Sequence, residues 1–192
     1  MSPYSKNQTL STWILYIIIG INIAVWLALQ TDYGVILLSE GAKVNSCIEQ
    51  GQYWRLLTAG FLHQNILHIF LNMYSLYAVW NFLKDYFRAI PLTLVYLGAI
   101  VTGSICSYYF NTSVSIGASG GVFGLIGAAL VFAVFEKESK LVQNLLQIIA
   151  INVAIGIINL NYIDNWAHLG GFLGGSILAV FFLQTTTSKR VS

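Results

Sequence analysis

A serine set between glycines is the residue best placed in this sequence to act as a nucleophile. Ser119 lies in the stretch Gly117-Ala118-Ser119-Gly120, where a long apolar run begins. Glycine permits close backbone approach and unusual dihedral angles, and the first N–H groups of a helix lack partners at the positive end of the helix dipole. A serine at such a helix start therefore has donors for a developing oxyanion beside it, although the same motif also serves helix packing.

Histidines supply the other groups that hydrolysis needs. The chain has three, His63, His68 and His168, and Asn72 follows His68 by one helical turn. A neutral imidazole accepts and returns a proton, and both His68 and Asn72 can donate hydrogen bonds to an oxyanion. The plainer interpretation is that these residues bridge helices. We expect no metal, because no glutamate lies between His63 and His68 as a His-Glu-x-x-His site would require.

The composition places these residues in a membrane. Of the 192 residues, 57% are hydrophobic and 8% are charged, whereas soluble domains are about 25% charged. Nine Lys and Arg with seven Asp and Glu cannot cover a water-facing surface. A soluble enzyme, a disordered chain and a nucleic-acid binder are therefore excluded, the last because the net charge of +2 is too small and dispersed. Two cysteines, Cys47 and Cys106, exclude a disulfide framework, and whether they pair is left open.

Six apolar runs are long enough to cross a bilayer as helices, which takes about 20 residues. We therefore predict an all-α membrane protein with one domain over residues 1–192 and transmembrane helices at 10–29, 66–83, 89–110, 116–135, 141–160 and 166–183. The long connection, 30–65, mixes apolar and polar residues, and we expect it to be a folded loop at the membrane interface.

Lys and Arg are unevenly divided between the two sides that this topology defines. With the N-terminus inside, seven lie in inside segments and two, Lys43 and Arg55, in outside segments, which predicts both termini in the cytoplasm. All seven acidic residues lie in loops or at helix ends, which counts against a proton-coupled transporter and an intramembrane aspartyl protease. In this topology Ser119, His68 and His168 lie at similar depth near the outer side.

Glycines at four-residue spacing indicate how the helices that carry Ser119 and His168 pack. Gly171 and Gly175 follow His168 on one face of the last predicted helix. Such pairs let membrane helices approach closely, so we expect this face to press against the helix that carries Ser119. Close packing would let the short imidazole reach the short serine.

Together these motifs resemble those of the rhomboid intramembrane serine proteases, most nearly the bacterial GlpG type reduced to its six-helix core. The resemblance covers nearly the whole chain. The motifs that carry it are Trp54-Arg55, His63-(x4)-His68-(x3)-Asn72, Gly117-x-Ser119-Gly120 and Ala167-His168-(x2)-Gly171-(x3)-Gly175.

The resemblance implies a Ser–His dyad, with Ser119 as nucleophile and His168 as general base. It also implies an oxyanion hole formed by His68, Asn72 and the backbone N–H of Ser119, with no cofactor. The implied partners are membrane lipid and the transmembrane segments of other membrane proteins, cut near their outer end. The implied location is the bacterial inner membrane with the active site toward the periplasm, and no oligomeric state is predicted.

The sequence departs from the family pattern at two positions. Phe123 stands where the GlpG type often carries a tyrosine, so we expect its ring to stack on His168 without a hydroxyl hydrogen bond. Lys84 stands where many members have an acidic residue. Asp164 lies four residues before His168, and we expect it to cap the last helix rather than complete a triad. The loop 161–165 is the expected lid above His168.

Two other classes of function are left open by these residues. A channel or transporter could use the polar layer as a conduction path, and Ser119 would then be dispensable. A catalytically inactive rhomboid-like protein could bind membrane partners, although the intact Ser119 and His168 argue against it.

Overall fold

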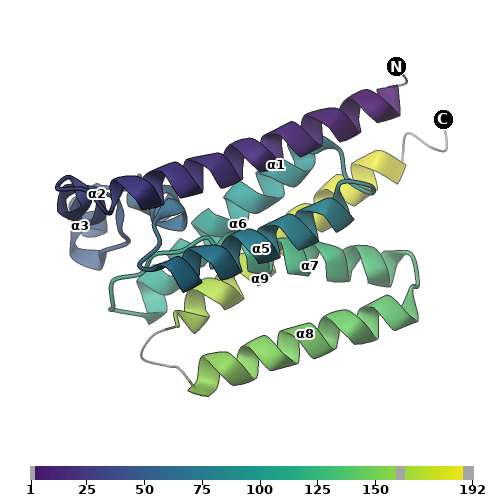
Figure 1. The fold of residues 1–192 in the computed structure, drawn as a ribbon. Coiled ribbons are helices and arrows are strands. Elements are labelled where there is room, and N and C mark those ends of the chain that lie inside the picture. The colour runs from purple at the N-terminus through teal and green to yellow at the C-terminus, as the bar shows by residue number, and fades with distance from the viewer. Residues whose placement is uncertain (1–2, 159–162, 188–192) are drawn as a thin grey trace.

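Long helices joined by short connections form the described part of the chain, which the computed structural model gives as residues 3–158 and 163–187 (Figure 1). The long ones are α1 (Pro3–Ala28), α5 (Ile66–Leu83), α6 (Ala89–Phe110), α7 (Ser119–Phe135), α8 (Ser139–Ile158) and α9 (Asn165–Thr187). Between α1 and α5 lie the short helices α2 (Gly34–Gly41), α3 (Asn45–Glu49) and α4 (Arg55–Thr58) and the 3₁₀ turn η1 (Ala59–Phe61). In these residues extended pairing is limited to an isolated bridge between Lys43 and Ser115.

The helices follow the predicted apolar runs, with differences at their ends. α5 and α6 have the predicted bounds, whereas α1 begins before residue 10. α7 begins at Ser119 rather than 116, because Gly117 has a φ of 126°, which helical backbone excludes. The predicted loop 30–65 is folded into α2, α3, α4 and η1. The predicted lid, 161–165, and the end of the predicted span 141–160 lie partly outside the described residues.

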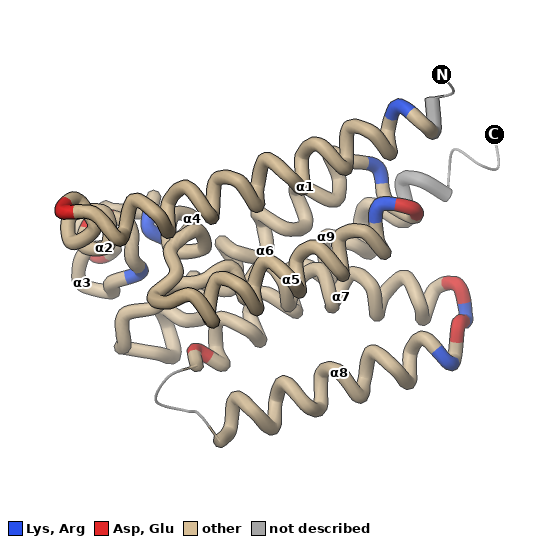
Figure 2. Tube along the Cα trace, in the orientation of Figure 1, with Lys and Arg blue, Asp and Glu red and all other residues tan. Residues whose placement is uncertain are grey.

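Five of these helices, α1, α5, α6, α8 and α9, are long and apolar enough to cross a membrane, while α7 is apolar but has 17 residues. Twelve residues of α7 are buried, because α5, α6, α8 and α9 all contact it. A helix enclosed in this way meets protein rather than lipid at most positions along its length. Figure 2 shows the charged residues at the two ends of the bundle, and the middles of the drawn helices carry no Lys, Arg, Asp or Glu.

Glycines bring α9 into backbone contact with two neighbours. A Cβ added to Gly171 would meet the carbonyl of Gly120, and one added to Gly175 would meet the backbone of Gly124. The pair Gly171 and Gly175 therefore faces α7, as predicted. On another side of α9, Gly170 would meet Cys106 and Thr102 of α6, and Gly174 would meet Thr102. The close approach of α9 to α7 depends on these missing side chains.

We predict that Gly171→Ala separates α7 from α9, because the new methyl group would fall on a backbone carbonyl that cannot move aside. Overpacking of this kind costs about 1–3 kcal/mol, so the melting temperature in detergent should fall. Gly20→Ala in α1 is the matched control, since nothing lies within 4 Å of a Cβ at Gly20. Equal melting temperatures for the two variants would contradict the packing described here.

Candidate active site

Two helix starts bring a hydroxyl and an imidazole together. Ser119 is the first residue of α7, and His168 lies in the first turn of α9. The Nε2 atom of His168 is 2.8 Å from the Oγ atom of Ser119, which is hydrogen-bonding distance. An unprotonated Nε2 in this position can accept the serine proton.

Phe123 holds the plane of the imidazole. It follows Ser119 by one turn on α7, and its ring stacks on that of His168 with centroids 4.2 Å apart and planes 12° from parallel. This is the contact expected from the sequence. The stack restricts rotation of the imidazole about its side-chain bonds, which keeps Nε2 directed toward Ser119.

His68 lies beside Gly117, close to the serine. A Cβ added to Gly117 would lie 2.7 Å from Nε2 of His68 and 3.9 Å from Oγ of Ser119. Gly117 is therefore required twice, for its positive φ and for the space that the imidazole of His68 occupies. Asn72 is buried one turn further along α5, and its Nδ2 donates to the carbonyl of His68 at 3.0 Å. The second N–H of that amide remains for another acceptor.

His63 supports the turn that leads to the serine. The backbone N–H of Ala118 donates to its Nε2 at 3.3 Å, and its ring packs edge-on against that of His68 with centroids 4.9 Å apart. Burial, reinforced by the charge of His68 and opposed by the backbone of Phe61, lowers the pKa of His63 to about 4. His63 is therefore a neutral hydrogen-bond acceptor near neutral pH, and its contact is with the backbone beside Ser119.

Trp54 and Arg55 act at a distance from the serine. The Arg55 side chain is 2% exposed, and its Nη1 donates to the carbonyls of Ser39 and Ala42 at 2.6 and 2.9 Å. Trp54 donates from Nε1 to the carbonyl of Glu40 at 3.1 Å. These bonds fold the segment between α1 and α5. That segment reaches the site at η1, where the carbonyl of Ala59 accepts from the N–H of Gly117 at 2.9 Å.

Asp164 caps α9, as the sequence predicted. Its Oδ1 accepts from the N–H of Ala167 at 3.0 Å, and its carbonyl accepts from the N–H of His168 at 3.2 Å. Its Oδ2 accepts from the hydroxyl of Ser107 on α6. Both carboxylate oxygens thus bond to groups other than the imidazole of His168, so this aspartate is not placed as the third member of a triad.

Lys43 lies near the site, and the sequence does not indicate its burial. It belongs to an outside segment of the predicted topology, and its side chain is fully buried. Its Nζ donates to the carbonyls of Asn111 and Ser113 at 2.6 and 3.2 Å, and its backbone pairs with Ser115. Nothing local marks this lysine, because all its partners come from the loop between α6 and α7.

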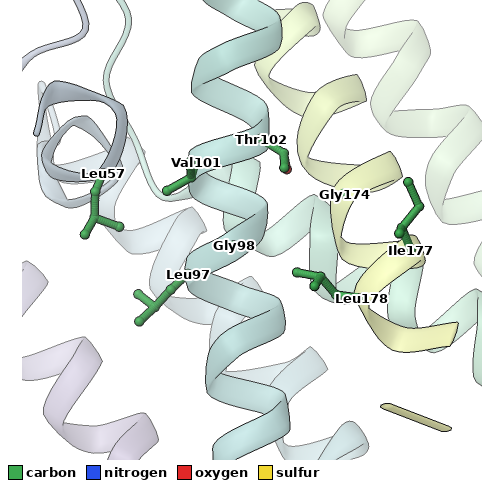
Figure 3. Close-up of a pocket in the computed structure, with 8 residues that line it drawn as sticks. All are labelled: Leu57, Leu97, Gly98, Val101, Thr102, Gly174, Ile177 and Leu178. Atoms are coloured by element: carbon green, nitrogen blue, oxygen red, sulfur yellow. The ribbon is translucent and has the colours of Figure 1, made fainter. Parts of the chain in front are cut away.

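Neither a metal site, nor a disulfide, nor the apolar hollow between α6 and α9 coincides with Ser119 and His168 in the described part of the chain. Within residues 3–158 and 163–187, no three His, Cys, Asp or Glu side chains group as a metal site would need. Cys47 and Cys106 are both free thiols in this structure. A hollow of about 500 Å³ lies between α6 and α9, but its walls are apolar and include Gly98, Thr102 and Gly174 rather than the residues above (Figure 3).

Comparison with known proteins identifies the family of this chain. The model of the Rhomboid domain family matches residues 50–185. The chain is 37% identical to "Rhomboid protease GluP" of Bacillus subtilis (strain 168) over 85% of this chain and 34% of that protein. It is 40% identical to "RHOMBOID-like protein 2" of Arabidopsis thaliana over 71% of this chain and 44% of that protein. "Rhomboid-like protease 1" of Toxoplasma gondii is 29% identical over 93% of this chain and 63% of that protein.

The chain therefore belongs to the rhomboid family, and it is a multi-pass membrane protein. It spans about a third of the length of the Bacillus relative and less than half of the Arabidopsis one.

Proposed function

We propose that this chain is an intramembrane serine endopeptidase that cleaves transmembrane segments of other membrane proteins near the outer face of the membrane. The observation that carries the proposal is the 2.8 Å approach of His168 Nε2 to Ser119 Oγ at the start of an enclosed helix. The Bacillus and Toxoplasma relatives are both named proteases, which supports the same activity.

In the proposed mechanism, His168 removes the proton from the Ser119 hydroxyl as Oγ attacks the scissile carbonyl carbon. The resulting imidazolium gives that proton to the leaving amine as the C–N bond breaks, which leaves an ester on Ser119. A water molecule, deprotonated by His168, then attacks the ester, and the proton returns to Ser119 as the acid product leaves. Atoms and charges balance with no added reactant except water.

The negative oxygen of each tetrahedral intermediate needs donors that are already in place. The backbone N–H of Ser119 lies at the start of α7, where a helix has no carbonyl to offer its first amides. His68 Nε2 lies next to Gly117, and Asn72 follows His68 by one turn of α5. We assign these three groups to the oxyanion hole.

The same proposal assigns an orientation. The start of α1 and the end of α9 lie at one end of the bundle (Figure 1). Within the described residues, the Lys and Arg that are at least partly exposed are Lys6, Lys84, Arg88, Lys137 and Lys140, all in segments assigned to the inside. The two outside ones, Lys43 and Arg55, are buried and donate to backbone carbonyls. We therefore place both termini in the cytoplasm, with the dyad toward the periplasm of a bacterial inner membrane.

Removing either member of the dyad should abolish cleavage. We predict that Ser119→Ala and His168→Ala each lose activity on a model transmembrane substrate in detergent or liposomes, with an unchanged melting temperature. The double variant should be no worse than either, because the two groups act as a unit. Substantial turnover by pure Ser119→Ala would overturn the assignment, and folded wild-type protein that never cleaves would favour a membrane-partner binder.

The oxyanion donors should affect turnover more than stability. Removing one such donor costs on the order of 10²–10³ in rate in soluble serine proteases, and partial redundancy among three donors should reduce that loss. We predict that His68→Ala and Asn72→Ala lower turnover per folded molecule and that the double variant is worse. Wild-type turnover in all three, with only a lower melting temperature, would make both residues bridges between helices.

Reporter fusions test the orientation. A fusion after Ser192 should report the cytoplasm, and one inserted within 31–52 should report the opposite side. If both report the same side, the chain crosses the membrane an even number of times between the two fusion sites, whereas the proposal requires an odd number. The assigned orientation of the site would then be wrong.

A further inference from the structure

A polar cluster joins the two loops from which the dyad helices start. Its members are Lys43, Ser107, Asn111, Ser115 and Asp164, here called the Asp164 bracket. The loop 111–118 leads into α7 and Ser119, and Asp164 stands immediately before α9 and His168. The bracket therefore lies between the two chain segments whose relative position sets the Ser119–His168 distance.

Hydrogen bonds hold both sides of the bracket. Lys43 binds the carbonyls of Asn111 and Ser113 through Nζ, and its own N–H and carbonyl pair with those of Ser115 at 3.1 Å each. Ser107 donates its hydroxyl to Oδ2 of Asp164. The side chains of Asn111 and Ser115 lie near that carboxylate and favour its ionised form. Lys43 thus holds the loop whose side chains lie beside Asp164.

The bracket carries two opposite charges, on the buried Lys43 and on the partly buried Asp164. Burial acts to raise the pKa of the Asp164 carboxyl, but hydrogen bonds outweigh it, so the pKa lies below its usual range and the group is ionised near neutral pH. Burial lowers the pKa of Lys43, and the charge of Asp164 acts in the opposite direction. A charge removed from water is stable when it is hydrogen-bonded and has an opposite charge nearby. Here the negative member, Asp164, lies one helical turn before His168.

We propose that Asp164 is a positioning residue for His168, and that its carboxylate, held by the Asp164 bracket, stabilises the imidazolium that forms when His168 takes the serine proton. The proposal rests on the function proposed above and deepens it. Asp164 acts through space and through the first turn of α9, not by bonding the imidazole. Its carboxylate caps the first turn of α9 through Ala167, and its carbonyl accepts from the N–H of His168, so its charge lies next to the turn that carries the imidazole.

Other groups near the same imidazole also affect how easily His168 is protonated. His68 from α5 opposes a positive charge on His168, and the Cys106 thiol of α6 lies near Asp164. Phe123 and Ser119 of α7 complete the surroundings without a charge at neutral pH. Asp164 thus favours a positive charge on His168, and His68 disfavours it.

Asp164→Asn tests the charge with little change in size, since the amide oxygen can still cap Ala167. We expect kcat to fall about 3–10-fold with KM unchanged, because a charge that shifts a proton equilibrium by up to one unit is worth up to tenfold. The acid limb of the kcat–pH profile should move to lower pH by about half a unit or more, since the imidazolium loses its opposite charge. Asp164→Glu, which restores the charge, should move the limb back.

Lys43→Met should move the acid limb the other way, to higher pH, because the carboxylate then acts on His168 without its own counter-charge. Asp85→Asn and Lys140→Met are matched controls, since both side chains are exposed in segments assigned to the opposite side. Neither control should move the profile.

A titration of the His168 ring by NMR, assigned by its loss in His168→Ala, reads the same shift without any turnover. If wild-type protein does not cleave but the His168 midpoint still moves in Asp164→Asn, the proposed function fails and the electrostatic role stands. If Asp164→Asn lowers kcat and the melting temperature but leaves both the acid limb and the NMR midpoint in place, Asp164 is a helix cap alone. That result overturns the proposal.

Discussion

The contact between the glycine faces of α7 and α9 is the constraint on which the site depends. A serine and a histidine have short side chains, so their helices must come almost to backbone contact before Nε2 can reach Oγ. Gly171 and Gly175 allow this, because each faces backbone atoms of Gly120 or Gly124 where a methyl group would not fit. The 2.8 Å distance between Ser119 and His168 is a consequence of that packing.

The ends of these helices are held by polar groups whose partners are all internal. Arg55 and Lys43 donate to backbone carbonyls, His63 accepts from Ala118, and Asp164 caps α9. In an apolar environment an unpaired group of this kind is costly. The loops therefore have few alternative arrangements, and Ser119 and His168 both lie at helix starts that these bonds hold in place.

Several of these features could be predicted from the sequence because they depend on local pattern. The apolar runs of α5 and α6 predicted their bounds, the spacing of Gly171 and Gly175 predicted the face toward α7, and the phenylalanine at 123 predicted the stack on His168. Each follows from helical periodicity and from residues a few positions apart.

Other features could not be predicted, because they arise between distant segments. The start of α7 at Ser119 depends on the positive φ of Gly117, and composition placed that start three residues too early. The burial of Lys43 depends on carbonyls almost 70 residues away, at Asn111 and Ser113. A count of charges does not distinguish such a buried lysine from one that faces solvent.

Covalent labelling tests the central claim most directly, because it asks whether Ser119 is an activated nucleophile without needing a substrate. Detergent-solubilised wild-type protein should react with a serine-directed fluorophosphonate, and peptide mass analysis should locate the adduct on Ser119. Ser119→Ala should not be labelled, and His168→Ala should be labelled far more slowly because its serine lacks a base. Equal labelling of wild type and Ser119→Ala, or none in folded wild-type protein, would contradict the account.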